Sequence, residues 1–120
     1  NNYKFDSNRI KIVVDKINSI KDVKKRTVIK LYLIDNYFIK LNKDEYHFIS
    51  KNTDLSQNDI VDLINLKLKE RSEYKTSGLN QKDISDWTGY KIGGITTTVT
   101  RIIKKYSLDK ISVRKKNKCV

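Results

Sequence analysis

The sequence predicts an all-α fold, a compact domain of about five to six helices that ends in a helix-turn-helix. Apolar residues recur along the chain at the three- and four-residue spacing of amphipathic helices. Residues that cap helix starts, among them Asp22, Ser56 and Asn80, stand just before or at the start of several of these runs. Near the end, glycines separate two helical runs within residues 81–106. The length of 120 residues suits a single domain of common size.

Residues 1–39 are expected to form a pair of helices. The first follows a cap at Asp6 or Ser7 and extends to about Ile20, and the second begins after Asp22. In the second helix we expect an inward apolar stripe and cations that fall mostly on the outward side. The stripe consists of Val23, Val28, Leu31, Tyr32, Ile34 and either Tyr37 or Phe38, and the cations are Lys24, Lys25, Arg26 and Lys30.

Residues 40–78 are expected to form a helical insertion and a linker. A short helix covers residues 44–51, and a longer one begins at Ser56, where Asp59 completes a near capping box. This longer helix, in the segment LSQNDIVDLINLKLKE, is so rich in apolar residues that we expect it to be the buried helix of the scaffold. The polar segment 71–78, RSEYKTSG, is the best linker candidate.

Residues 79–120 are expected to form the helix-turn-helix and a basic tail. Asn80 caps the first helix, and Gly89 ends it in the left-handed conformation. Gly93 and Gly94 open the second helix, which has an apolar stripe and an opposite face without acids. The stripe is Ile95, Val99, Ile102 and Ile103, and the opposite face is Thr96, Thr97, Thr100, Arg101 and Lys104. Hydroxyl groups and cations on one helix face suit a DNA groove. Residues 113–118 of the tail are read as a short strand or as a disordered arm along phosphates.

The formal net charge is +12, and it is unevenly distributed. Residues 1–40 carry 10 Lys and Arg against 4 Asp and Glu, residues 41–75 carry 6 against 7, and residues 76–120 carry 10 against 3. A polyanion is the natural partner of such basic ends, because each neutralised phosphate releases counterions. The alternatives are an inert basic surface, or a patch for an acidic protein or an anionic membrane.

Other classes of protein have little support in the sequence. No apolar run approaches the ~20 residues of a membrane span, and no signal peptide precedes the first helix. The lone Cys119 has no internal partner, which fits a cytoplasmic location. The chain has no phosphate-binding loop, no metal-ligand spacing, and no nucleophile matched to its only histidine, His47. We therefore expect no enzyme, no cofactor, no metal and no small-molecule substrate. A chain without methionine is also expected to be part of a longer protein.

The segment TGYKIGGITTTVTRI, residues 88–102, resembles the last helix-turn-helix of bacterial RNA polymerase sigma factors. Gly89 and Gly93 fall on the two glycines of that family's pattern, Ile95 on its valine, Val99 on its leucine and Arg101 on its second arginine. Upstream, residues 17–37 are similar to the apolar helix that precedes this unit. The family's serine is replaced by lysine, its threonine by glycine and its Ser-Arg pair by two threonines, and about forty residues separate the two matching parts.

The resemblance implies a domain that reads the −35 promoter element while its first helices dock on core RNA polymerase. The expected protein partner is core RNA polymerase or an anti-sigma-like protein. It also implies three groups of DNA contacts. Recognition-helix residues facing the groove are Lys91, Ile92, Gly94, Thr96, Thr97 and Thr98; phosphate contacts at the preceding helix are Gln81 and Lys82; backbone contacts are Arg101, Lys104 and Lys105.

Two other functions remain open from the sequence. One is a free-standing helix-turn-helix regulator of phage or plasmid type, which would bind DNA as a dimer at half-sites one helical turn apart. The other is a basic helical adaptor that binds an acidic protein. A DNA-binding assay would distinguish the adaptor from the two DNA-binding functions. The oligomeric state would distinguish the dimeric regulator from a sigma-like monomer.

Overall fold

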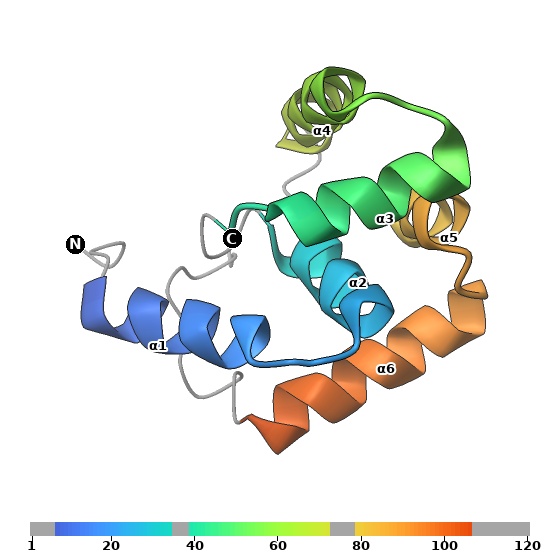
Figure 1. Ribbon diagram of the computed structural model, residues 1–120. Helices are drawn as coiled ribbons and strands as arrows, with labels where there is room; N and C mark the ends of the chain where they lie inside the picture. Colours follow the sequence, from blue (N-terminus) through green and yellow to red (C-terminus); the bar gives the residue numbers. More distant parts are fainter. Residues whose placement is uncertain (1–6, 35–38, 73–78, 107–120) are drawn as a thin grey trace.

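The computed structural model describes residues 7–34, 39–72 and 79–106, and this part of the chain is all-α with six helices and no strand (Figure 1). The predicted fold class is therefore confirmed. Asp6, Tyr37 and Phe38, most of the expected linker and the basic tail lie outside the described residues. The helices are α1 (Ser7–Asn18), α2 (Val23–Leu33), α3 (Lys43–Thr53), α4 (Gln57–Ser72), α5 (Gln81–Thr88) and α6 (Ile92–Lys105).

Helix α2 is the centre of the fold. It contacts α1, α3, α5 and α6, and the five consecutive residues 27–31 are all buried. An amphipathic helix buries only one face, so five successive buried positions mean that neighbours surround α2.

The expectation that the helix after Ser56 would be the buried one is wrong. Helix α4 packs chiefly on α3 and lies at the edge of the molecule (Figure 1). Only Ile60 and Ile64 of its apolar residues are buried, whereas Leu66 is 52% exposed. Apolar content indicated a helix with a packing face, but it did not determine how many neighbours that helix has.

The predicted helix starts after residue 22, at Ser56 and at Asn80 are confirmed by hydrogen bonds. In each case a side-chain oxygen accepts from a backbone N–H group of the first turn, which otherwise has no partner within the helix. The pairs are Asp22 with Lys24 at 2.9 Å, Ser56 with Asp59 at 3.1 Å, and Asn80 with Asp83 at 2.8 Å. Helix α2 ends at Leu33, before Tyr37 and Phe38, one of which the predicted stripe included.

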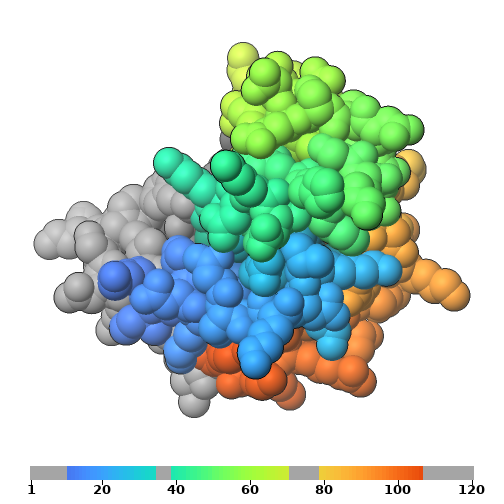
Figure 2. Space-filling model, in the orientation of Figure 1, coloured from blue at the N-terminus to red at the C-terminus, as the bar shows by residue number. Residues whose placement is uncertain are grey.

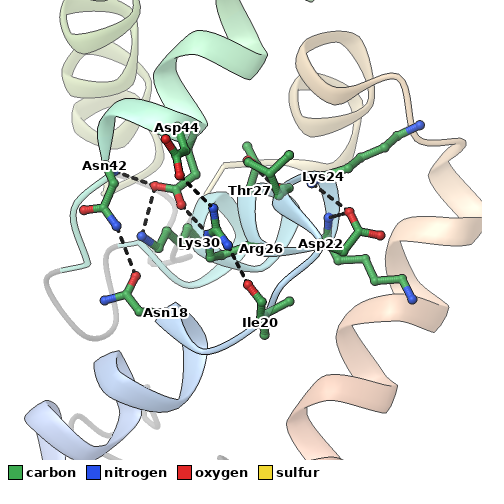
Figure 3. Close-up of polar contacts among 12 residues, drawn as sticks. Asn18, Ile20, Asp22, Lys24, Arg26, Thr27, Lys30, Asn42 and Asp44 are labelled. Atoms are coloured by element: carbon green, nitrogen blue, oxygen red, sulfur yellow. Dashed lines mark hydrogen bonds and ion pairs between the residues drawn. The ribbon is translucent and has the colours of Figure 1, made fainter.

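Two cations expected on the outward side of α2 point inward instead. Lys30 is 1% exposed, Arg26 is 11% exposed, and both pair with Glu45 of α3, which has no exposed surface. Lys30 Nζ lies 3.0 Å from Glu45 Oε1, while Arg26 Nε donates to Glu45 Oε2 and its Nη1 to the Ile20 carbonyl. Dashed lines in Figure 3 mark the polar contacts around Arg26 and Lys30. The sequence-based assignment of Arg26 and Lys30 was wrong because their partner lies on another helix.

The charges of this cluster depend on one another. Burial by itself would raise the pKa of Glu45, but hydrogen bonds from Arg26, from the backbone of Asn42 and from Lys30 hold the pKa below its usual 4.5. Burial lowers the pKa of Lys30 below its usual value, and the hydrogen bond and charge of Glu45 oppose that shift. The cluster therefore holds α3 against α2 through a carboxylate that accepts from both basic side chains.

The helix-turn-helix consists of α5, the turn at residues 89–91 and α6, and it packs directly on α2. The Leu79 N–H donates to the Leu31 carbonyl at 3.0 Å, so the chain returns to α2 after α3 and α4. Gly89 has the predicted left-handed conformation, with φ of 81°. Helices α2, α5 and α6 thus form one three-helix unit even though α3 and α4 intervene in the sequence.

Candidate nucleic-acid interface

Helix α6 presents one face to the core and the opposite face to solvent. Ile95 is 0% exposed and Val99 is 3% exposed, and both pack in the core. On the opposite side, Thr97, Thr100 and Arg101 are exposed. Helix α6 lies along the lower side of the molecule in Figure 2, far from α4 at the upper side. We call the side of α6 that bears Thr97, Thr100, Arg101 and Lys104 its outward face. This face is open to solvent, as the amphipathic pattern predicted.

One flank of this face meets the start of α5. Gln81 Nε2 donates to Thr96 Oγ1 at 2.9 Å, which links the first turn of α5 to the second turn of α6. Ile92, one turn before Thr96, is 49% exposed although it is a large apolar residue. Gln81, Ile92 and Thr96 thus lie together along the edge where the two helices converge.

The other flank meets the turn and the start of α2. Gly94 is half-buried, and a Cβ added there would lie 3.7 Å from the Tyr90 ring, in ordinary contact. Thr98 is also half-buried and lies beside Tyr90. Burial raises the pKa of Tyr90, the charge of Asp22 adds to this rise, and the Thr98 side chain opposes it. Gly94 and Thr98 therefore border the outward face of α6 rather than lying at its centre.

Local hydrogen bonds fix the turn between the helices. The Gly89 N–H donates to the Ser85 carbonyl at 2.9 Å, and Ser85 Oγ donates to the Tyr90 carbonyl. Lys91 then stands at the N-cap of α6 with an extended backbone and no side-chain capping bond. The first turn of α6 therefore keeps backbone N–H groups directed along the helix axis toward its N-terminus, where an anion is favoured.

Cations concentrate at the far end of α6. Arg101, Lys104 and Lys105 are exposed, and α6 itself contains no acidic residue. The Lys105 ammonium lies 5.6 Å from the centre of the Tyr106 ring, and Lys16 of α1 donates to the Tyr106 carbonyl at 3.1 Å. Positive charge at this end also suits the C-terminus of the helix itself.

Lys82 lies on the surface of α5 beside an acid. Its ammonium is 3.3 Å from Asp86, and the two side chains are 78% and 60% exposed. An exposed pair of this kind is weak and is screened by salt. Lys82 therefore remains free to exchange Asp86 for another anion.

Eight of the eleven residues assigned to DNA contact are exposed, while Gln81, Gly94 and Thr98 are half-buried. The sequence reasoning missed Lys24, whose ammonium lies 5.0 Å from the centre of the Tyr90 ring. This contact brings a cation at the start of α2 beside the turn of the helix-turn-helix. No local pattern connects Lys24 with Tyr90, because the contact depends on how α2 packs against the later helices.

The part of the chain that the structure describes contains no candidate metal cluster and no candidate membrane span. No group of three or more His, Cys, Asp and Glu side chains gathers there in a way that would hold a metal ion. His47 is exposed. None of the described helices is both long and apolar enough to span a bilayer.

Comparison of this chain with known proteins does not assign it to a family. No family model matches the chain, and no curated protein or solved structure resembles it significantly.

Proposed function

We propose that this chain is a transcription protein that binds duplex DNA by inserting α6 into the major groove. The observation that carries this proposal is the outward face of α6, which is exposed, bears threonines and cations, and has no acid on the helix. A helix with these properties at the end of a helix-turn-helix is suited to the groove, which admits one α-helix.

The arrangement of the helices supports this docking. Helix α6 has 14 residues, or a length of about 21 Å at the usual rise per residue. In the described part of the chain, α3 and α4 pack away from its outward face, on the other side of α2 and α5 (Figure 1). A duplex could therefore approach α6 without displacing either helix.

The exposed residues divide into two roles under this proposal. Arg101, Lys104 and Lys105 hold phosphates, because a phosphate attracts any cation regardless of base sequence. Lys82 and Lys91 near the helix starts do the same. The resemblance assigns Lys91 to the groove, but Lys91 stands at the N-cap of α6, before the helix itself. The threonines nearer the start of α6 meet the base edges. Affinity then depends mainly on the cations and preference for a sequence mainly on the threonines.

A sigma-like role is the more specific form of the proposal. It rests on the sequence resemblance of residues 17–37 and 88–102, and it adds core RNA polymerase as a partner and a cytoplasmic location. Co-purification with core polymerase tests it directly. A monomer in sedimentation supports this form, whereas a dimer on a palindromic site supports a free-standing regulator.

The DNA proposal is tested by binding of a random duplex pool at two salt concentrations. We expect affinity to fall steeply with salt, because phosphate contacts release counterions. Arg101→Ala should weaken binding to all sequences alike and reduce the salt slope by about one. Thr97→Ala should instead change the preferred sequence at one position more than the affinity common to all sequences.

The matched control is Lys43→Ala, which removes an exposed cation from the start of α3, a helix that does not pack on α6. It should leave binding almost unchanged. An absence of binding at low salt, or equal losses for Arg101→Ala and Lys43→Ala, would refute the assignment of the DNA surface to α6.

A further inference from the structure

The exposed side chains of residues 92–100 in α6 share one chemical feature. From Ile92 to Thr100, the large and hydroxylated side chains that face solvent are Ile92, Thr96, Thr97 and Thr100, and each carries a methyl group. Ile92 is 49% exposed, and Gly93 adds no side chain. The first charged side chain on the helix, Arg101, follows only after these residues.

Two of the threonine hydroxyls already have partners within the protein. Thr97 Oγ1 donates to the Gly93 carbonyl at 3.2 Å, and Thr96 Oγ1 accepts from Gln81 Nε2 at 2.9 Å. These bonds occupy hydrogen-bonding capacity that would otherwise be offered to a base. A methyl group forms no such hydrogen bond, and both residues are exposed.

The side chains that read each base in the major groove differ in chemistry. Guanine is usually read by paired donors of Arg or Lys, and adenine by the amide of Asn or Gln. Residues 92–100 of α6 include none of these side chains. Thymine is the base marked by an apolar group, its 5-methyl, which is contacted by methyl-bearing side chains.

We propose, building on the DNA-binding function above, that Ile92, Thr96, Thr97 and Thr100 make α6 a reader of thymine methyl groups. The preferred ligand is duplex DNA whose A·T pairs present several thymine methyls to the major groove. Arg101 and the lysines beyond it then hold the flanking phosphates and set the affinity common to all sequences.

The test compares duplexes that differ only in that methyl group. An alternating A·T duplex is matched with the same duplex containing deoxyuridine, which retains base pairing and lacks the 5-methyl. An alternating G·C duplex is matched with its 5-methylcytosine form, which gains a methyl at the equivalent place. Burying one methyl-sized group is worth about fourfold in affinity. We therefore expect at least a fourfold loss on replacing thymidine by deoxyuridine, and a gain on methylating cytosine.

Two variants of one residue assign the effect to the protein. Thr97→Ser keeps the hydroxyl and removes the methyl, so it should lose affinity for the thymidine duplex and change little on the deoxyuridine duplex. Thr97→Val keeps methyl groups and removes the hydroxyl, so it should retain the preference for thymidine. Circular dichroism confirms that each variant is folded, which is expected because Thr97 is exposed.

The outcomes separate this inference from the function on which it rests. Equal binding of thymidine and deoxyuridine duplexes by the wild-type protein would overturn methyl reading and leave DNA binding intact. Equal behaviour of Thr97→Ser and Thr97→Val would likewise overturn it. An absence of binding to every duplex would refute the proposed function itself.

Discussion

Replacement of Glu45 by alanine tests how strongly the buried ion cluster holds α3 to α2. Glu45 has no exposed surface and accepts hydrogen bonds from Arg26, from Lys30 and from the backbone N–H of Asn42. Truncation at this position leaves Lys30, itself 1% exposed, without its only carboxylate partner within 4.0 Å in the described part of the chain. The variant therefore replaces a compensated buried charge with an uncompensated one.

The expected cost follows from what remains around the two cations. Breaking a buried ion pair by removing one partner costs about 3–5 kcal/mol. Lys30 keeps a hydrogen bond to the Lys40 carbonyl at 3.3 Å, and Arg26 keeps one to the Ile20 carbonyl. We therefore expect Glu45→Ala to lower the free energy of unfolding by about 3–4 kcal/mol, near the lower end of that range. Domains of this size are stable by about 5–15 kcal/mol, so the loss is a large share of the total.

The matched control is the neighbouring acid. Asp44 also lies near Arg26, at 3.6 Å, but its side chain is 78% exposed. Asp44→Ala should therefore cost less than about 1 kcal/mol. Urea titration followed by circular dichroism gives both values. Losses of equal size for the two variants would show that burial of the cluster contributes nothing beyond a surface ion pair.

Two further predictions concern the turn and the carboxylate. Gly89→Ala should lower the free energy of unfolding by about 1 kcal/mol, because the backbone φ is 81° at this position. Gly93→Ala should instead raise it by about 0.5 kcal/mol, because Gly93 lies in α6 and an added Cβ meets no atom within 4 Å. Thermal unfolding measures both changes, and a gain in stability for Gly89→Ala would contradict the strain argument. The advantage of the wild type over Glu45→Gln should depend on pH, because the pKa of Glu45 in the folded state lies below its usual 4.5. That advantage is full above about pH 4.5 and is lost as the pH falls through the lower folded-state pKa, so unfolding curves that show a constant difference in acid would refute it.

Local signals in the sequence predicted the fold class and most helix starts. The capping oxygens of Ser56 and Asn80 lie three residues from the N–H groups they accept from, so a short stretch of sequence contains both partners. The same is true of Gly89, whose left-handed conformation ends α5. The exposure of Thr97 and Arg101 also follows from helical periodicity, because the buried residues Ile95 and Val99 fix the opposite face.

Contacts between distant residues could not be predicted in this way. Lys30 and Arg26 look like surface cations on an amphipathic helix, but Glu45 reaches them from α3. Thr98 was assigned to the groove by alignment, yet it borders Tyr90 on the flank of α6. Both outcomes depend on which helices pack together.

The amino-acid sequence by itself determined where the helices begin, which face of α6 is apolar, and how the charge is distributed along the chain. Those properties depend on residues within one or two turns of each other. Only the tertiary structure decided that α2 rather than α4 is surrounded by neighbours, and that one carboxylate on α3 neutralises two cations on α2. Burial is a property of the whole assembly of helices, so no single segment contains the information that fixes it.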